Sequence, residues 1–445
     1  MRPKITKKSS KTNEATIGHG VEALLEQALA RGASDIHFEP NERTVRVRMR
    51  IDGWLEQTTK LPLPQYPAIA AYLKHWAGLT DQSPGTPQSG TVDFDTKHLS
   101  ASLTVNTMPT MDGEKVVIHL VPQRSEPATL ESLGFWGGAL RQIEQIVAEP
   151  HGLVLASSPD TTGASMSLLG IMHLLNNPAL NIATLEDPIT QRVASVNQTE
   201  VRLAAGVPFS TYLQALLKQD PDVIMVSSLR ETETISLGLE AALSGKLVLG
   251  GLHNHSAVQA IEHVTRLSNE PFLLAAALRL SIGQRFVRRL CPHCREMFKP
   301  DHAYRDQLKK LLNMSAVKSV RTVHALEKAA VEEGLGKAID GQLLPLSTTE
   351  THFAHFWRAS EHGCEHCHFK GYTGRIGVCE VLPITEDLRK LVVEKTTAST
   401  LQAAALDTGI IPLQLDAFIK ALRGLTSVDE ILPLMAGLTA RASAV

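Results

Sequence analysis

The chain has 445 residues, which is enough for two or three domains, each with a sizeable apolar core. Its 44 basic and 46 acidic side chains nearly balance, so no overall field would draw it to nucleic acid or acidic lipid, and we expect no nucleic-acid partner. The sequence contains no run of about 18 apolar residues and no signal-peptide core, which predicts a cytoplasmic protein.

The N-terminal part of the sequence predicts a basic tail followed by a small α/β domain. Residues 1–18 carry five basic side chains within their first eleven positions, and we expect them to be a solvated, disordered tail. Residues 19–121 contain an amphipathic helical pattern over Val21–Arg31 and an alternating strand pattern over Thr44–Arg50. Residues 122–130, with two prolines and a glutamate, are predicted to be a linker.

Residues 131–290 predict an α/β core built on a parallel sheet. Four apolar runs alternate with helical stretches, which is the pattern of strands covered by helices and favours a RecA-like fold. The first run is followed by a Ser/Thr/Gly-rich loop and a helical segment from Met166 to Leu175, which is the order of a phosphate-binding loop. Such a loop alone is more often an ordinary turn. The four runs are 152–156, 181–185, 222–226 and 246–250.

The loop at residues 158–165 departs from the pattern G-x-x-x-x-G-K-[ST]. In that pattern the first glycine permits a tight turn, the lysine reaches the phosphates and the last hydroxyl ligates magnesium. Ser158 stands at the first glycine and Ala164 at the lysine, while Gly163 and Ser165 match. We predict a degenerate phosphate loop with weakened binding of ATP and Mg²⁺, leaving backbone N–H groups to attract phosphate. Its residues are Ser158, Pro159, Asp160, Thr161, Thr162, Gly163, Ala164 and Ser165.

Four of the five cysteines form two C-x-x-C pairs, Cys291 with Cys294 and Cys364 with Cys367. This is the spacing of a tetrahedral zinc site built from two knuckles. Redox disulfides are the alternative, but a reducing cytosol favours one structural Zn²⁺ held by four thiolates. Cys379 is expected to be a buried apolar residue. Three histidines are near enough in sequence to compete as ligands: His293, His366 and His368.

Residues 291–380 are therefore predicted to be a zinc module, with a helical insert between its knuckles at about 300–360. We interpret the insert as a helical cap on the module, because inserted surface segments are tolerated at low cost; a partner-binding insert is the alternative. Residues 381–445 carry apolar residues at helical spacing and predict a C-terminal helical tail.

Six further blocks of sequence follow the loop: Asn181–Pro188, Gln219–Val226, Arg230–Thr234, Gly245–His253, Gln284–Cys294 and Gly371–Arg375. Together they resemble the hexameric motor ATPases of type II secretion and type IV pilus assembly, from about residue 20 to about residue 390. The resemblance implies a RecA-like P-loop core and the family's second N-terminal domain. It also implies a ring of six subunits that works at an inner-membrane platform, with ATP and Mg²⁺ as cofactors of active members. The tetracysteine module is typical of assembly and secretion members.

The chain departs from that family where the chemistry lies. The family's Walker B strand ends in Gly-Glu, and here the same positions read Ser227-Ser228, so the expected general base is missing. The family's arginine-bearing stretch reads Ser83–Thr91 here, and a further family arginine appears as Thr104. A general base contributes about a hundred- to ten-thousandfold in rate, and an arginine finger about a thousandfold or more. We therefore expect hydrolysis to be lost.

Four family positions retain a carboxylate or an imidazole. A surviving catalytic role is one interpretation of these residues. We favour a structural one, because buried acids with hydrogen-bond partners and a histidine beside an apolar strand commonly support the fold. They are Glu186, Asp187, Asp222 and His253.

Two functions follow. The first is a pseudo-ATPase that forms a homo-oligomer, or a mixed hexamer with an active motor paralogue that it helps to assemble or regulates, in the cytoplasm or peripherally at the inner membrane. The second is a working ATPase with an unorthodox nucleotide site, in which Lys246 or Arg230 replaces the lost cation. Charged family residues are replaced on both sides of the expected subunit interface, which favours the pseudo-ATPase. The sequence does not distinguish pilus assembly, protein secretion and DNA uptake.

Overall fold

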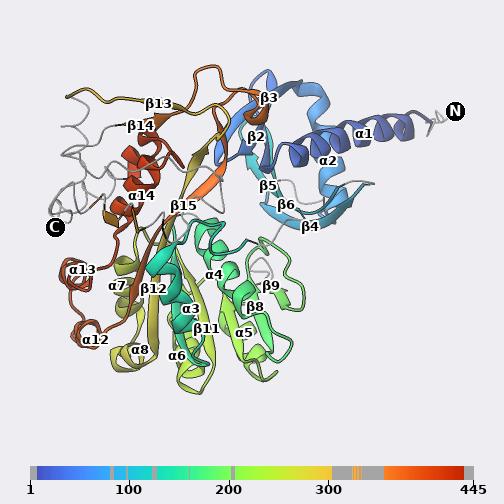
Figure 1. Ribbon diagram of the computed structural model, residues 1–445. Coiled ribbons are helices and arrows are strands. Elements are labelled where there is room, and N and C mark those ends of the chain that lie inside the picture. The colour runs from blue at the N-terminus through green and yellow to red at the C-terminus, as the bar shows by residue number, and fades with distance from the viewer. Residues whose placement is uncertain are drawn as a thin grey trace. The chain divides into compact units, whose positions relative to one another are not determined.

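The computed structural model describes residues 8–80, 85–96, 99–122, 128–159, 161–201, 206–302 and 355–434, with six single positions between 323 and 332. The chain divides into two compact units, Met1–Glu126 and Pro127–Val445 (Figure 1). The predicted linker lies partly outside the described residues, at 123–127, and the predicted insert lies mostly outside them. No helix in the described part of the chain is both long and apolar enough to cross a membrane.

The N-terminal unit is one antiparallel sheet with its helices packed on the apolar face. The sheet order is β3-β2-β1-β6-β5-β4, and strict alternation along β2 and β5 sends every second side chain into the core. The strands are β1 Ala33–Pro40, β2 Thr44–Ile51, β3 Trp54–Pro62, β4 Gln88–Asp95, β5 Ser100–Thr110 and β6 Gly113–Pro122. The helices are α1 Lys8–Ala30, the 3-10 turn η1 Leu63–Gln65 and α2 Tyr66–Trp76.

Helix α1 begins earlier than the sequence predicted. Residues 8–18, expected to be part of a disordered tail, belong to the helix that continues to Ala30. The segment contains no proline, and a Cβ on Gly18 would lie 3.1 Å from the Tyr72 hydroxyl, so the helix passes close to α2 there. The helix therefore begins before Val21, where the amphipathic pattern starts, and at Gly18 it already lies close to α2.

The second unit is built on a seven-stranded sheet of order β15-β12-β7-β11-β10-β8-β9. Six neighbouring strands, β12, β7, β11, β10, β8 and β9, run parallel, and β15 is antiparallel to β12. The predicted mixed α/β fold with a parallel sheet is confirmed. The strands are β7 Gly152–Ser157, β8 Ile182–Glu186, β9 Asn197–Glu200, β10 Val223–Val226, β11 Leu247–Leu252, β12 Leu278–Leu290 and β15 Tyr372–Pro383.

Helices cover both faces of this sheet because its central strands are apolar on both sides. All six residues of β7 are buried, and Leu153 and Val154 enter different apolar clusters. Helices α3 and α4 contribute to one cluster, and α5 to α8 to the other. Their bounds are α3 Gly137–Val147, α4 Thr161–Leu175, α5 Phe209–Leu217, α6 Thr232–Leu243, α7 Ala257–Leu267 and α8 Pro271–Ala277.

The C-terminal helices do not form one separate tail. Leu388 of α12 and Leu401 of α13 join the α5–α8 side of the core, whereas Phe418 of α14 packs with Phe356 in a third apolar cluster. Residues that the sequence grouped as 381–445 therefore belong to two different packing regions. The remaining elements are β13 Glu296–Phe298, β14 Phe356–Arg358, the 3-10 turn η3 Glu365–Cys367, α12 Glu386–Val393, α13 Ala398–Asp407 and α14 Leu413–Leu422.

Candidate functional site

The loop predicted to bind phosphate lies at the carboxyl end of the central strand β7. The strand ends at Ser157 and α4 begins at Thr161, so strand, loop and helix follow in the predicted order. Ser158 is fully buried, and its N–H donates to the Leu252 carbonyl at 3.2 Å. Asp160 lies outside the described residues. Carboxyl ends of parallel strands are where ligands bind in open α/β sheets.

The side chain in the lysine position is enclosed. Ala164 is only 2% exposed and belongs to the apolar cluster on the α3/α4 side of the sheet, while Ser165 next to it is 5% exposed. One turn further on, the Ser167 hydroxyl contacts the Gly163 carbonyl at 3.2 Å and the side-chain oxygen of buried Gln284. No residue from 158 to 165 carries a positive charge. Backbone N–H groups at the start of α4 are therefore the means by which this segment can attract phosphate.

Glu186 ends β8 and is completely buried. One of its oxygens accepts hydrogen bonds from the Thr184 hydroxyl at 2.7 Å and from the Gln198 amide at 2.9 Å. Burial raises the pKa of Glu186 despite these hydrogen bonds, which favour the ionised form. Because Gln198 lies on the neighbouring strand β9, Glu186 joins two strands. The geometry supports the structural interpretation of this residue.

Asp187, Ser228, Arg230 and His253 all follow the carboxyl ends of their strands. The N–H of Asp187 donates to the Ser227 hydroxyl at 3.2 Å. Partial burial raises the pKa of Asp187, and the nearby charge of Arg230 opposes this. Residues Val226 of β10 and Gly250 of β11 are paired in register, so Ser228 and His253 come at the same edge. The structure brings these four residues to the edge that also holds the loop.

Asp222 and Lys246 lie at the opposite edge of the sheet from the loop. Asp222 precedes β10 and accepts a hydrogen bond from the Asn181 N–H at 2.7 Å. Lys246 precedes β11 and contacts Asp220 at 3.3 Å and the Pro221 carbonyl at 2.9 Å. Strands of four to six residues separate the two edges by roughly 13 Å or more. Asp222 is therefore not at the site, and Lys246 cannot supply the missing cation there.

The two threonines at family arginine positions are direct neighbours on the N-terminal sheet. Thr91 of β4 pairs with Thr104 of β5, which pairs in turn with His119 of β6. The His119 ring hydrogen-bonds the buried carboxylate of Asp35. Ser83 lies outside the described residues. Sequence reasoning missed the His119–Asp35 pair, because only the strand register brings residues 84 positions apart together.

A second charged group lies on the same sheet. The carboxylate of Glu39 contacts Arg46 at 3.0 Å, Arg48 at 2.7 Å and Lys115 at 3.2 Å. Burial opposes ionisation of Glu39, but the hydrogen bonds from Arg48 and Lys115 outweigh it and lower its pKa to about 2. The alternation of charged residues along β1 and β2 was visible in the sequence, whereas the position of Lys115 required the β1–β6 pairing.

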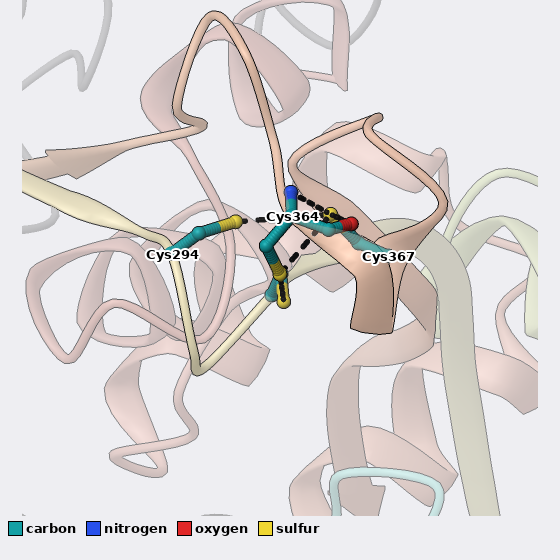
Figure 2. Close-up of side chains that lie close together, drawn as sticks. Cys294, Cys364 and Cys367 are labelled. Carbon is teal, nitrogen blue, oxygen red and sulfur yellow. Dashed lines mark hydrogen bonds between the residues drawn. The ribbon is translucent and has the colours of Figure 1, made fainter.

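The four predicted zinc ligands converge. Cys291 follows β12 and Cys367 precedes β15, and the antiparallel pairing of these strands carries the two knuckles to one place. Sulfur atoms of Cys291 and Cys364, and of Cys294 and Cys367, lie 3.7 Å apart, and all four lie within 4.8 Å of one another. Figure 2 shows Cys294, Cys364 and Cys367 directed toward one another.

This spacing fits a tetrahedral thiolate site. Four sulfurs at about 2.3 Å from a zinc ion would lie about 3.8 Å from one another, whereas a disulfide requires about 2.05 Å. The N–H groups of Cys364 and Gly371 donate to the Cys367 sulfur at 3.2 and 3.1 Å. Burial opposes ionisation of Cys367, but these backbone hydrogen bonds lower its pKa to about 6. All five cysteines are free of disulfides, so the disulfide alternative is not realised.

Two of the competing histidines stack on each other. The rings of His293 and His366 are 4.0 Å apart and nearly parallel, and both residues are exposed, as is His368. Among the described residues, the group able to hold a metal consists of the four cysteines without any histidine. Cys379 is buried, as expected, and burial raises its pKa to about 12.

Comparison with known proteins identifies the family. The model of the type II/IV secretion system protein family matches residues 10–433, so the chain belongs to this family. It is 33% identical over 412 residues to the type IV pilus assembly ATPase PilB of Thermus thermophilus, covering 93% of this chain and 42% of that protein. It is 32% identical over 420 residues to type II secretion system protein E of Klebsiella pneumoniae, covering 94% and 76%. The chain thus spans less than half of the Thermus relative.

Solved structures agree on the fold. The Legionella pneumophila ATPase DotB has a TM-score of 0.61 at 17% identity, covering 94% of this chain and 95% of that one. The pilus retraction motor PilT with bound ADP has a TM-score of 0.58 at 16% identity, covering 93% and 96%. At these identities the likeness concerns the fold alone.

Proposed function

We propose that this chain is a subunit of a type IV pilus or type II secretion machine that does not hydrolyse ATP efficiently and acts as an assembly or regulatory partner of an active motor. The observation that carries the proposal is Ala164. It occupies the lysine position of the phosphate loop, and its side chain is enclosed in the apolar cluster. A loop of this kind can attract phosphate through N–H groups but supplies no side-chain charge to the transferred phosphoryl group.

Residues elsewhere support the same proposal. Ser228, at the carboxyl edge, has no carboxylate with which to orient or activate water near neutral pH. Thr91 and Thr104, side by side on the N-terminal sheet, cannot act as arginine fingers. An arginine finger contributes about a thousandfold or more, and a general base about a hundred- to ten-thousandfold. These factors do not simply multiply, but each alone would reduce turnover severely.

The proposed partner is an active motor of the same family in a mixed hexamer, with a homo-oligomer as the second form of assembly. Family rings place the second N-terminal domain of one subunit against the core of the next. The N-terminal unit here has the folded sheet such a contact needs, with an ordered charged group around Glu39. A subunit without arginine fingers forms a weaker polar contact with its neighbour unless that neighbour supplies the arginines. This favours the mixed ring at an inner-membrane platform.

We further propose that Cys291, Cys294, Cys364 and Cys367 hold one structural Zn²⁺. The sulfur spacing and the two N–H groups that stabilise the Cys367 thiolate support this. The ion would have four protein ligands and no open position, which is the arrangement of structural rather than catalytic zinc.

A second candidate function is an ATPase with an unorthodox site. Arg230 favours it, because it lies at the carboxyl edge within electrostatic reach of Asp187, whereas Lys246 lies at the other edge. In this alternative Arg230 would supply the charge that Ala164 cannot.

The deciding experiment measures phosphate release and nucleotide binding by the purified chain, alone and co-expressed with an intact motor. The proposal expects release at the buffer background for the chain alone, and co-purification with the motor. Magnesium-dependent turnover that disappears in Arg230→Ala would establish the second candidate. A chain that remains monomeric and captures neither the motor nor a platform component would refute the partner role.

A further inference from the structure

Helix α14 carries a buried ion pair, Asp416 with Lys420, in which all three ammonium N–H groups and both carboxylate oxygens form hydrogen bonds. Lys420 is fully buried and Asp416, one turn earlier, is 2% exposed. The Lys420 ammonium donates to the Gly134 carbonyl at 2.7 Å, the Gly377 carbonyl at 2.7 Å and Asp416 at 2.6 Å. An ammonium group has three N–H donors, so none remains. Asp416 also accepts from the Trp136 indole at 2.7 Å and from the Cys379 N–H at 2.8 Å.

The ion pair bonds first to segment 128–136, through the Gly134 carbonyl and the Trp136 indole. This segment lies near the start of the second unit, directly after residues 123–127. Gly134 has a φ of +94°, and a Cβ there would lie 2.7 Å from the Gly377 carbonyl and 3.2 Å from the Lys420 ammonium. Only glycine permits this approach. The Gly377 N–H donates in turn to the Leu133 carbonyl at 2.9 Å. Segment 128–136, β15 and α14 therefore meet around one charge.

The other end of α14 is held by a different buried carboxyl group. Glu380, on β15, accepts from the Leu413 N–H at 3.3 Å and from the Ala257 N–H at 2.5 Å. Leu413 and Ala257 are the first residues of α14 and α7. One carboxyl group therefore accepts from an otherwise unbonded N–H group of each helix and lies at the positive end of both helix dipoles. Helix α7 begins directly after loop 253–256, and Arg285 donates to the His255 carbonyl at 3.2 Å.

We infer that α14 couples segment 128–136 to loop 253–256. The helix packs in one apolar cluster with β15, Lys420 joins it to segment 128–136, and Glu380 joins its first residue to Ala257, which directly follows loop 253–256. A displacement of either anchor acts on the same helix, because Lys420 lies on α14 and Glu380 accepts from the first N–H group of α14. The inference is independent of whether the chain hydrolyses ATP.

The test is amide hydrogen exchange on the full-length protein. The double variant Asp416→Asn/Lys420→Met removes both charges, because removal of one would leave the other buried and unpaired. Exchange should accelerate at 133–137 and also at 253–260, by about tenfold or more, since hydrogen bonds to charged groups are among the stronger ones. The matched control is Lys74→Met/Glu114→Gln, which removes a 3.2 Å ion pair of the N-terminal unit. It should change neither region.

Faster exchange at 133–137 with no change at 253–260 would overturn the inference, as would the same changes in the control. The reverse direction is tested with Glu380→Gln, whose amide cannot accept both N–H groups without presenting a donor to one of them. Coupling is reciprocal, so this variant should accelerate exchange at 133–137 as well as at 253–260. If the double variant fails to fold, Glu380→Gln alone tests the coupling. Faster exchange confined to 253–260 in this variant would refute it.

Discussion

The carboxyl edge of the parallel sheet and the cysteine cluster are both reached along strand β12. The strand pairs with β7 from Leu278 to Gly283 and then runs on to Leu290, next to Cys291. At the edge, the loop after β7 carries short hydroxyl side chains and the buried Ala164. At the cluster, four thiols converge with backbone N–H groups already directed at one of them. Packing and backbone hydrogen bonds hold both regions in place, and the regions differ in their side chains: hydroxyls and a buried alanine at the edge, thiols at the cluster.

The largest expected effect comes from breaking the cluster. Cys364→Ser/Cys367→Ser should lose the metal and reduce the free energy of unfolding by more than about 4 kcal/mol, because loss of a structural metal is among the most destabilising changes. Elemental analysis should give about one zinc per wild-type chain and none in the variant. Cys379→Ala, which removes a thiol outside the cluster, should keep the zinc. Full metal content in the double variant would contradict the assigned ligands.

Restoring the missing charge should have a smaller and mixed effect. Ala164→Lys should raise nucleotide affinity, yet overpacking at this enclosed position should cost about 1–3 kcal/mol of stability. Ala164→Met, of similar length and no charge, should show the same loss of stability without the gain in affinity. Thermal melting and a nucleotide titration on both variants separate charge from packing.

The restored charge alone should not restore turnover. Phosphate release should stay near background in Ala164→Lys until Ser228→Glu, Thr91→Arg and Thr104→Arg are added. If the single variant hydrolysed ATP at a rate typical of its relatives, the roles assigned to the other three positions would be wrong.

Glu186 should contribute about 1 kcal/mol of stability, and the size of this contribution should depend on pH. Its pKa is raised in the folded state above the ordinary 4.5, so the folded chain holds the proton more tightly than the unfolded one. Stability from this group is thus present below pH 4.5 and is lost as pH rises toward the folded pKa. Relative to Glu186→Gln, which cannot ionise, the wild type should lose stability over that window. Denaturation at several pH values measures the difference, and a constant difference would exclude the raised pKa.

The smallest effect distinguishes the two edges of the sheet. Asp222→Asn weakens one hydrogen bond to the Asn181 N–H and should cost about 0.5–1.5 kcal/mol. It should leave nucleotide binding unchanged, whereas Asp187→Asn, at the loop's edge, should change it. Equal effects of both variants on a nucleotide titration would mean that Asp222 acts at the site after all.

Local patterns predicted the elements of the core well, because burial on both faces produces continuous apolar runs. The runs predicted at 152–156 and 246–250 match β7 and β11 within two residues at each end. The cysteine spacing predicted the cluster because ligand geometry restricts spacing directly. Asp222 precedes an apolar run and therefore lies at the amino edge of the parallel sheet, where its hydrogen bond to the Asn181 N–H agrees with the structural role that the sequence favours.

Long-range register could not be predicted from one sequence. The contact of Trp136 with Asp416 joins residues 280 positions apart, and no local periodicity signals it. The same holds for His119 and Asp35, whose contact depends on which strands become neighbours. The division of the C-terminal helices between two apolar clusters also depends on tertiary packing, which helical spacing does not reveal.

The pairing of β12 with β15 has a consequence for how this chain can be altered. The two strands and the cysteines close the chain on itself between Cys291 and Cys364, 73 positions apart. The entropy cost of closing such a loop grows only with the logarithm of its length, by about 0.6 kcal/mol for each doubling. Because the paired strands and the cysteines fix the two ends, a change in the number of residues between Cys291 and Cys364 should cost little stability and leave both strands paired.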